Sequence, residues 1–193
     1  MTDLIQRRSD DDEEVPGGVL LAAAAGGNEV AWATLVARYD RLLWTIARMH
    51  DLDAESAADV CQTTWLRLVE RVDRLRDPDR VGAWLATTAR HESRRTLRKM
   101  MREKARNGAA ALNRASDIAP APGADDAVWH AVAAMPERCN RLLRLLFLTP
   151  QPRYSEIAAA LDMPIGSIGP TRSRCLRRLR TMLESDGEGR DIA

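Results

Sequence analysis

The chain has 193 residues, and its 29 Lys and Arg nearly balance its 28 Asp and Glu, so the formal net charge is only +1. This balance excludes a uniformly basic protein. The lack of a long apolar run and of a signal-like N-terminus predicts a cytoplasmic one. The charge is nevertheless clustered, because residues 90–106 contain eight Lys or Arg against two acids and residues 172–180 contain five Arg and no acid. Separate basic blocks of this kind indicate binding to a polyanion.

The composition favours an all-helical protein. Ala and Arg are abundant and aromatic residues make up only 4% of the chain, and the apolar residues recur at helical rather than strand spacing. Cys61, Cys139 and Cys175 stand far apart without a CxxC pair, so the sequence predicts three unpaired core residues and neither a disulfide scaffold nor a zinc site.

The first half of the chain predicts a small helical domain over residues 17–106, preceded by a disordered acidic tail over residues 1–16. Asn28 and Asp53 are expected to cap its second and third helices. From Asp53 to Arg74 the sequence alternates between an apolar and a polar stripe, which is typical of an amphipathic helix with one buried face. The apolar stripe consists of Ala57, Cys61, Trp65, Leu68, Val72 and Leu75.

The basic block belongs to a long helix that is predicted from about Asp79 to Ala105. Its polar face repeats at helical spacing through Thr87, His91, Arg94, Arg98 and Arg102. Periodicity is then lost over residues 107–124, which are rich in Ala, Pro and Gly and predict a flexible linker.

The second half predicts another small helical domain over residues 125–185, followed by a polar tail over residues 186–193. Pro136 fits the first position of one helix, and Ser155 is expected to cap a short helix. A turn then leads into the arginine-rich helix, and this pattern predicts a helix-turn-helix, in which the second helix enters the major groove of DNA. We expect one of two starts for that helix. It begins at Ile168 with Ser167 as its cap, so that Pro170 falls in the first turn, where the backbone N–H groups have no partner in the helix, or it begins at Pro164 and is bent at Pro170.

Several stretches resemble bacterial sigma factors of the extracytoplasmic-function (ECF) type. In the first half they read DVCQTTWLRLVERV from Asp59 and GAWLATTARHESRRTLRK from Gly82, and in the second half MPERCNRLLRLLFL and YSEIAAALDMPIGSI. Thr63 departs from the acid usual in the family, TPQPR at residues 149–153 is one residue longer than the usual loop, and Gly169 and Pro170 replace a usual lysine and serine. The resemblance implies a sigma factor that binds core RNA polymerase, recognises and helps to open specific promoters, and is held by an anti-sigma factor.

The resemblance also assigns roles to residues. The helix from Asp53 would dock on the polymerase clamp, and its exposed stripe has the mixed charge that suits a protein partner. The helix from Asp79 would bind the minus-ten element as melted single strand, and the arginine-rich helix would read the minus-thirty-five element as duplex. Trp84 could help to open the duplex, but its place beside Val81 and Leu85 favours a core position. The polymerase-binding residues would be Asp59, Gln62, Thr63, Arg67 and Glu70; the minus-ten residues Trp84, Thr87, Arg90, His91, Arg94, Arg95 and Arg98; and the minus-thirty-five residues Ser167, Thr171, Arg172, Arg174, Arg177, Arg178 and Arg180.

Other functions fit the sequence less well. A stand-alone helix-turn-helix repressor or activator would explain the second half but not the first, and a helical protein-interaction module with an acidic partner would explain only the basic faces. His91 and Glu92 begin a zinc-protease pattern, but Arg95 stands where its second histidine should be. We therefore expect no enzyme, no metal and no cofactor.

Overall fold

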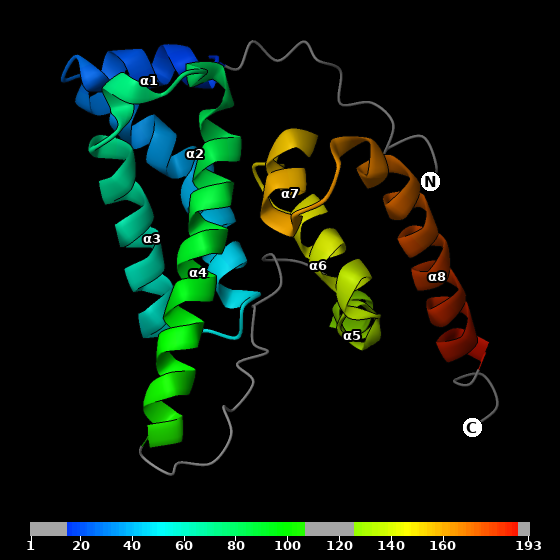
Figure 1. Ribbon diagram of the computed structural model, residues 1–193. Helices are drawn as coiled ribbons and strands as arrows, with labels where there is room; N and C mark the ends of the chain where they lie inside the picture. Colours follow the sequence, from blue (N-terminus) through cyan, green and yellow to red (C-terminus); the bar gives the residue numbers. More distant parts are fainter. Residues whose placement is uncertain (1–14, 107–125, 189–193) are drawn as a thin grey trace.

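The computed structural model describes residues 15–106 and 126–188, and all regular secondary structure in these ranges is helical. Two groups of helices lie side by side, α1 to α4 in one and α5 to α8 in the other (Figure 1). This arrangement confirms the predicted all-helical fold. The predicted acidic tail over residues 1–16, apart from its last two residues, and the predicted linker lie outside the described residues.

The first group forms because two side-chain caps start its amphipathic helices. Helix α1 (Gly17–Ala25) precedes α2 (Glu29–Arg48), whose Asn28 cap accepts a hydrogen bond from the Ala31 N–H at 3.0 Å. Helix α3 (Ala54–Val69) begins after Asp53, whose carboxylate accepts a hydrogen bond from the Ser56 N–H at 2.8 Å. This bond lowers the pKa of Asp53. Both predicted caps are confirmed.

The predicted helix from Asp53 to Arg74 is too long. Helix α3 ends at Val69, and two short 3-10 turns, η1 (Val72–Arg74) and η2 (Pro78–Arg80), lead into α4 (Val81–Arg106). The apolar pattern continues past Val69 because Val72 and Leu75 still pack against the core from the turns. Periodicity alone therefore overestimates the length of this helix.

The second group contains α5 (Asp126–Ala134), α6 (Glu137–Leu146), α7 (Tyr154–Leu161), the turn η3 (Ile165–Ser167) and α8 (Ile168–Glu188). The cap expected at Ser155 is wrong: α7 begins at Tyr154, where the Glu156 side chain accepts a hydrogen bond from the Arg153 N–H at 2.9 Å. Pro136 is the N-cap of α6 rather than its first residue.

The start of α8 agrees with the first of the two predicted starts. The helix begins at Ile168, directly after η3, so that Pro170 occupies its third position. No helical hydrogen bond is lost there, because the N–H groups of a first turn have no acceptor within the helix. Ser167 donates its hydroxyl hydrogen to the Pro164 carbonyl, at 2.6 Å, and thereby holds the turn.

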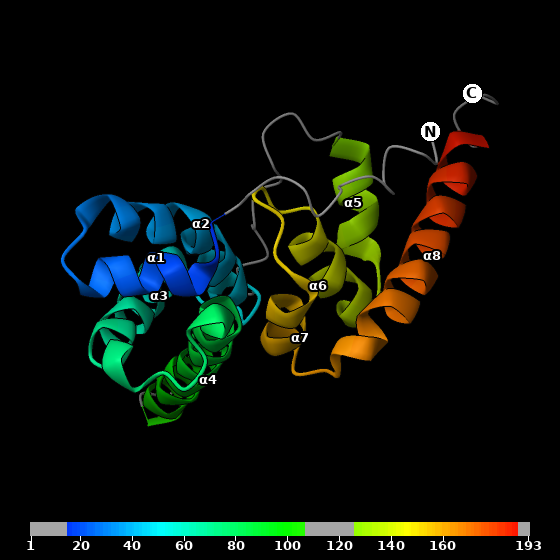
Figure 2. The same cartoon turned by 90° about the horizontal axis from the view of Figure 1, so that it is seen from above.

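The two groups share one continuous apolar core. It runs from Leu35 and Leu43 on α2 through Leu85 on α4 to Leu143 on α6 and Ile157 on α7, all fully buried. Helix α7 packs more extensively against α4 than against any helix of its own group. The view from above shows these two helices next to each other where the groups meet (Figure 2). The sequence left the mutual arrangement of the two predicted domains open, and in the structure they are closed onto each other.

The expectation of three unpaired cysteines is wrong for two of them. Cys139 on α6 and Cys175 on α8 form a disulfide, with their Cα atoms 5.4 Å apart. Sequence spacing could not reveal this pair, because 36 residues separate the partners and only the crossing of α6 and α8 brings them together. Cys61 remains a buried free thiol, and burial raises its pKa to about 12.

Candidate nucleic-acid and protein interfaces

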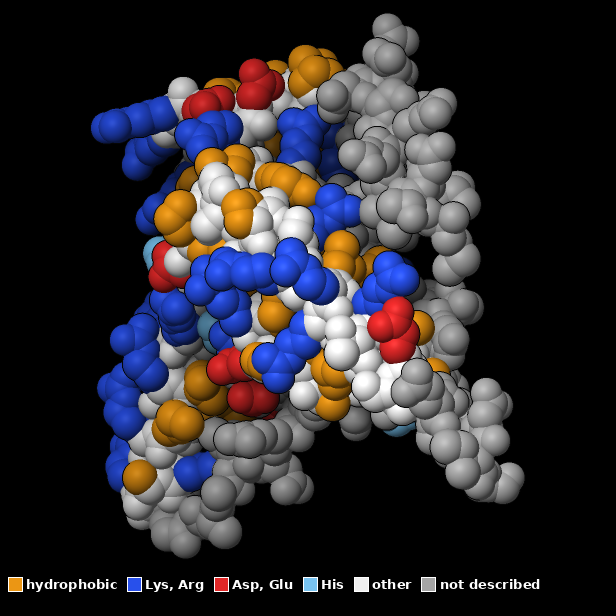
Figure 3. Space-filling view, turned by 90° about the vertical axis from the view of Figure 1, so that its right-hand side faces the viewer, with side chains coloured by type: hydrophobic (Ala, Val, Ile, Leu, Met, Phe, Trp, Pro, Cys, Tyr) orange, Lys and Arg blue, Asp and Glu red, His pale blue; other side chains and the backbone are white. Residues whose placement is uncertain are grey.

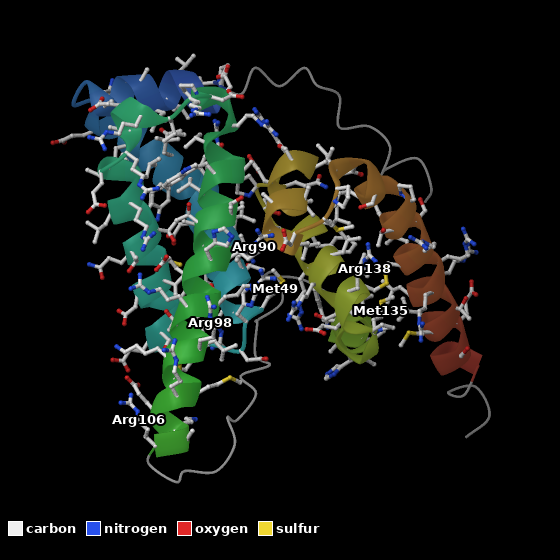
Figure 4. The ribbon with its side chains drawn as sticks, viewed as in Figure 1. Met49, Arg90, Arg98, Arg106, Met135 and Arg138 are labelled. Atoms are coloured by element: carbon white, nitrogen blue, oxygen red, sulfur yellow. A yellow bond between two sulfur atoms is a disulfide. The ribbon has the colours of Figure 1, made fainter. Side chains whose placement is uncertain are left out.

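The predicted minus-ten residues on α4 divide between a covered and an open side. Arg90 lies on the side of α4 that faces α7, whereas Arg98 lies farther along the helix (Figure 4). Trp84 and Thr87 are half-buried and Arg90 is only 7% exposed. The remaining predicted residues, His91, Arg94, Arg95 and Arg98, are exposed.

Arg90 and Arg94 meet a carboxylate from the other helix group. Nη1 of Arg90 lies 2.6 Å from Oδ1 of Asp162, and Nη1 of Arg94 lies 3.5 Å from Oδ2. Asp162 ends α7 in the left-handed conformation, with φ of 57°. The hydrogen bond and charge of Arg90, aided by Arg94, hold the pKa of the Asp162 carboxyl below its usual range. Two residues predicted to bind DNA therefore form ion pairs within the chain itself.

An arginine-rich cavity of about 1100 Å³ opens between these two helices. Trp84, Thr87 and Arg90 line it from α4, and Ala158, Ala159 and Asp162 line it from α7. The turns after α3 add further cationic side chains, namely Arg71, Arg74, Arg76 and Arg80. Sequence analysis missed these four arginines, because they lie in the turns rather than at helical spacing on the basic face.

An apolar groove of about 520 Å³ separates α2 from α3. We call it the α2–α3 groove, and its lining residues are Trp32, Val36, Asp40, Trp44, Ala58, Cys61, Gln62, Trp65, Leu66 and Val69. Trp32 and Trp65 pack edge to face with ring centroids 5.7 Å apart, and the Trp65 indole donates a hydrogen bond to Asp40 at 3.3 Å. Leu66 and Val69 are 57% and 56% exposed. An exposed apolar surface bordered by polar residues is typical of a protein-interaction site.

Among the predicted polymerase-binding residues, Gln62 lines this groove. Asp59 on α3 and Glu70 directly after it are exposed, while Thr63 is half-buried. Arg67 instead forms an ion pair with Glu92 of α4 at 3.0 Å, with 32% of its side chain exposed. Sequence analysis missed Leu66 and Val69, although two apolar residues between the polar positions of α3 were a visible signal.

Helix α8 presents most of its predicted arginines to solvent. The view onto α8 shows Lys and Arg side chains in a band across the middle of this face and along one margin (Figure 3). Arg174, Arg177 and Arg178 are exposed, Arg172 donates a hydrogen bond to the Tyr154 hydroxyl at 3.1 Å, and Arg180 pairs with Glu184 at 2.8 Å.

Thr171 does not fit its predicted role. It is only 4% exposed, and its hydroxyl accepts a hydrogen bond from Arg174 at 3.4 Å. Thr171 lies one helical turn before the buried Cys175, so it faces the core of the second group rather than a DNA groove. Ser167 is half-buried at the end of η3.

A comparison with protein families assigns the first helix group. The family described as Sigma-70 region 2 matches residues 35–103, from within α2 almost to the end of α4. Over these residues the chain is similar to Sigma-70 region 2. The match contains the basic face of α4 and all residues of the α2–α3 groove except Trp32, and it agrees with the sigma factor that the sequence predicted. A search of curated proteins found no match to this chain.

Solved structures share the fold of most of this chain. One is CnrH, solved in complex with the cytosolic domain of CnrY; it is 23% identical, with a TM-score of 0.55 over 89% of this chain and 99% of that chain. Another is the sigma factor RpoE from Bartonella quintana, solved in complex with the anti-sigma factor NepR; it is 23% identical, with a TM-score of 0.56 over 80% of this chain and 98% of that chain. At this identity the likeness establishes a common fold. No helix in the described ranges is both long and apolar enough to cross a membrane.

His50 follows region 2 helix α2 and lies near the boundary between the two groups. Burial, together with the charges of Arg141, Arg94 and Arg90, lowers its pKa from 6.5 to about 4. The folded protein binds a proton at His50 more weakly than the unfolded chain does. The neutral His50 ring therefore makes its full contribution to the free energy of unfolding above pH 6.5, and this contribution is lost as the pH falls towards 4.

We expect His50→Gln to remove this part of the pH dependence. The wild-type protein should lose up to about 3 kcal/mol of unfolding free energy between pH 6.5 and 4 that the variant does not lose. Urea unfolding at several pH values measures the difference. His130→Gln, at an exposed position on α5, should keep the wild-type slope, and an equal slope for His50→Gln would contradict the assignment.

Proposed function

We propose that this protein is an ECF-type alternative sigma factor that directs core RNA polymerase to specific promoters. The observation that carries the proposal is the pairing, within region 2, of an exposed apolar groove with a basic helix. The groove suits a protein partner, whereas the arginines of α4 and of the neighbouring turns suit nucleic acid. One compact domain would thus join polymerase to DNA.

Each of the three surfaces has its own role in this proposal. The α2–α3 groove, with Asp59, Gln62 and Glu70 beside it, binds the polymerase clamp. The basic face of α4 holds the melted strand of the minus-ten element, where phosphates meet arginine and unstacked bases meet Trp84. The exposed arginines of α8 contact the minus-thirty-five duplex.

The chain uses binding energy alone in this role. Phosphate contacts by Arg177 and Arg178 position the second group on DNA, and Arg172 and Arg174 near the start of α8 reach base edges. Strand separation is stabilised by capture of the unstacked strand on α4, so no catalytic residue or cofactor is required. Core RNA polymerase and promoter DNA are the partners, and an anti-sigma factor is a further one by analogy with RpoE and NepR.

A reconstituted transcription reaction tests the proposal. Purified protein is added to core RNA polymerase with fragmented DNA from the source genome, and the transcript starts are sequenced. We expect starts at a common set of promoters that core polymerase alone does not use. If no promoter-specific RNA appears and core polymerase does not bind, the proposal fails. Sequence-specific duplex binding without polymerase would instead favour the stand-alone repressor or activator.

A further inference from the structure

The two helix groups approach each other closely at Gly82 on α4. A Cβ atom at this position would collide with the carboxylate of Glu156 on α7 and would lie 2.7 Å from Cε1 of Tyr39. Neither neighbour has room to withdraw, because Glu156 is 5% exposed and bonded to the Arg153 N–H, and Tyr39 is 3% exposed. The missing side chain of Gly82 therefore allows α7 to lie directly on α4.

The second point of contact is electrostatic. Asp162 presents its carboxylate to Arg90 and Arg94, two residues of the face that we assign to minus-ten DNA. A carboxylate against arginines offers them the same anionic oxygen atoms as a DNA phosphate. Asp162 is still 57% exposed, so its carboxylate lies at the rim of the contact and competes directly with an incoming strand.

The contact is only partly satisfied. Nε of Arg90 is buried and has no hydrogen-bond partner among the described residues, whereas Nη1 has only the contact with Asp162. Buried donors without good acceptors cost free energy. The contact between α4 and α7 is thus held by shape and charge. Arg90 can exchange Asp162 for a better anionic partner without breaking a complete hydrogen-bond network.

We propose that α7 inhibits region 2 of its own chain by covering the minus-ten side of α4. This inference rests on the proposed function, in which α4 binds the melted strand. The closed form leaves the α2–α3 groove and the exposed arginines of α8 accessible, so polymerase and duplex DNA have free surfaces to bind. The melted minus-ten strand binds only after α7 has separated from α4, and a partner that prefers the separated form shifts the equilibrium towards it.

Two variants of the full chain are expected to open the molecule. Gly82→Ala adds the colliding methyl group, and once α7 has left, the Tyr39 ring gains the vacated space. Asp162→Asn removes the anion while keeping a residue that tolerates the left-handed helix end. Affinity is measured by fluorescence anisotropy with a labelled single-stranded 20-mer of mixed sequence, compactness by the radius of gyration in small-angle scattering, and folding by far-UV circular dichroism.

Each variant has a matched control. Gly169→Ala makes the same change in α8, where a Cβ atom meets nothing within 4 Å. Glu137→Gln removes the same charge from an ion pair contained within α6. We expect Gly82→Ala to bind the single strand about tenfold more tightly than wild type, because overpacking of this size shifts a two-state equilibrium by such a factor. Asp162→Asn should gain about threefold, and both should have a larger radius of gyration.

The two readouts separate the possible failures. If both variants stay as compact as wild type, the self-inhibition is overturned and the proposed function stands. If they expand and still bind the single strand no better, the assignment of α4 to minus-ten DNA fails, and the inference fails with it. Should Gly82→Ala lose its helical signal, Asp162→Asn alone decides.

Discussion

Replacing Val69 by aspartate is expected to weaken binding to core RNA polymerase by about 30-fold or more, the scale of an interface hot spot. Val69 lies at the edge of the α2–α3 groove with 56% of its surface exposed. A carboxylate buried there against a polymerase partner would lack a compensating charge or donor. Titration of labelled core polymerase with each protein measures the loss.

Val19→Asp is the matched control for this experiment. Val19 on α1 is 57% exposed, so the substitution introduces the same charge at an equally exposed valine outside the groove. We expect its affinity for polymerase to stay within about twofold of wild type, as surface substitutions away from an interface usually do. Equal losses for the two variants would show that general charge, rather than the groove, governs binding.

Replacing Arg174 by alanine is expected to reduce affinity for the preferred minus-thirty-five duplex by about tenfold or more, because an arginine that reads a guanine contributes on this scale. The preferred duplex is first selected from a randomised library by the reconstituted holoenzyme. Arg174 is exposed near the start of α8, where a recognition helix meets base edges. The variant should also lose discrimination at one base pair of the selected sequence.

Arg178→Ala should behave differently. Arg178 is exposed farther along α8, where arginines contact phosphates, so its loss should weaken binding to all duplexes alike and reduce the slope of log affinity against log salt by about one. Competition between the selected and a scrambled duplex at two salt concentrations separates the two effects. A uniform loss for Arg174→Ala as well would remove the base-reading role from that residue.

Local signals predicted the individual helices well. Asn28 and Asp53 cap their helices because a short polar side chain at this position bonds the free N–H groups of the first turn, and no distant contact is required. The start of α8 at Ile168, one of the two predicted starts, accommodates Pro170 for a similar reason, since a first turn has no hydrogen bond for proline to break. The basic face of α4 likewise follows from helical spacing alone.

Side-chain partners were harder to predict. The family resemblance assigned Arg67, Arg90 and Thr171 to binding faces. In the structure each is partly or wholly buried by contacts with residues that the sequence does not place beside it. Arg67 meets Glu92 of α4, and Arg90 meets Asp162, 72 positions farther along the chain. Cys139 and Cys175 became partners through the crossing of α6 and α8.

The sequence by itself determined that the protein is helical and where most of its helices begin. It also determined that two basic helices and one amphipathic helix provide the candidate binding surfaces. These properties depend on residues within a turn or two of one another. Only the tertiary structure decided that α7 lies on α4, that an apolar groove opens between α2 and α3, and which arginines remain free. Those outcomes depend on the packing of helices distant in the sequence, and at Gly82 on the absence of a single side chain.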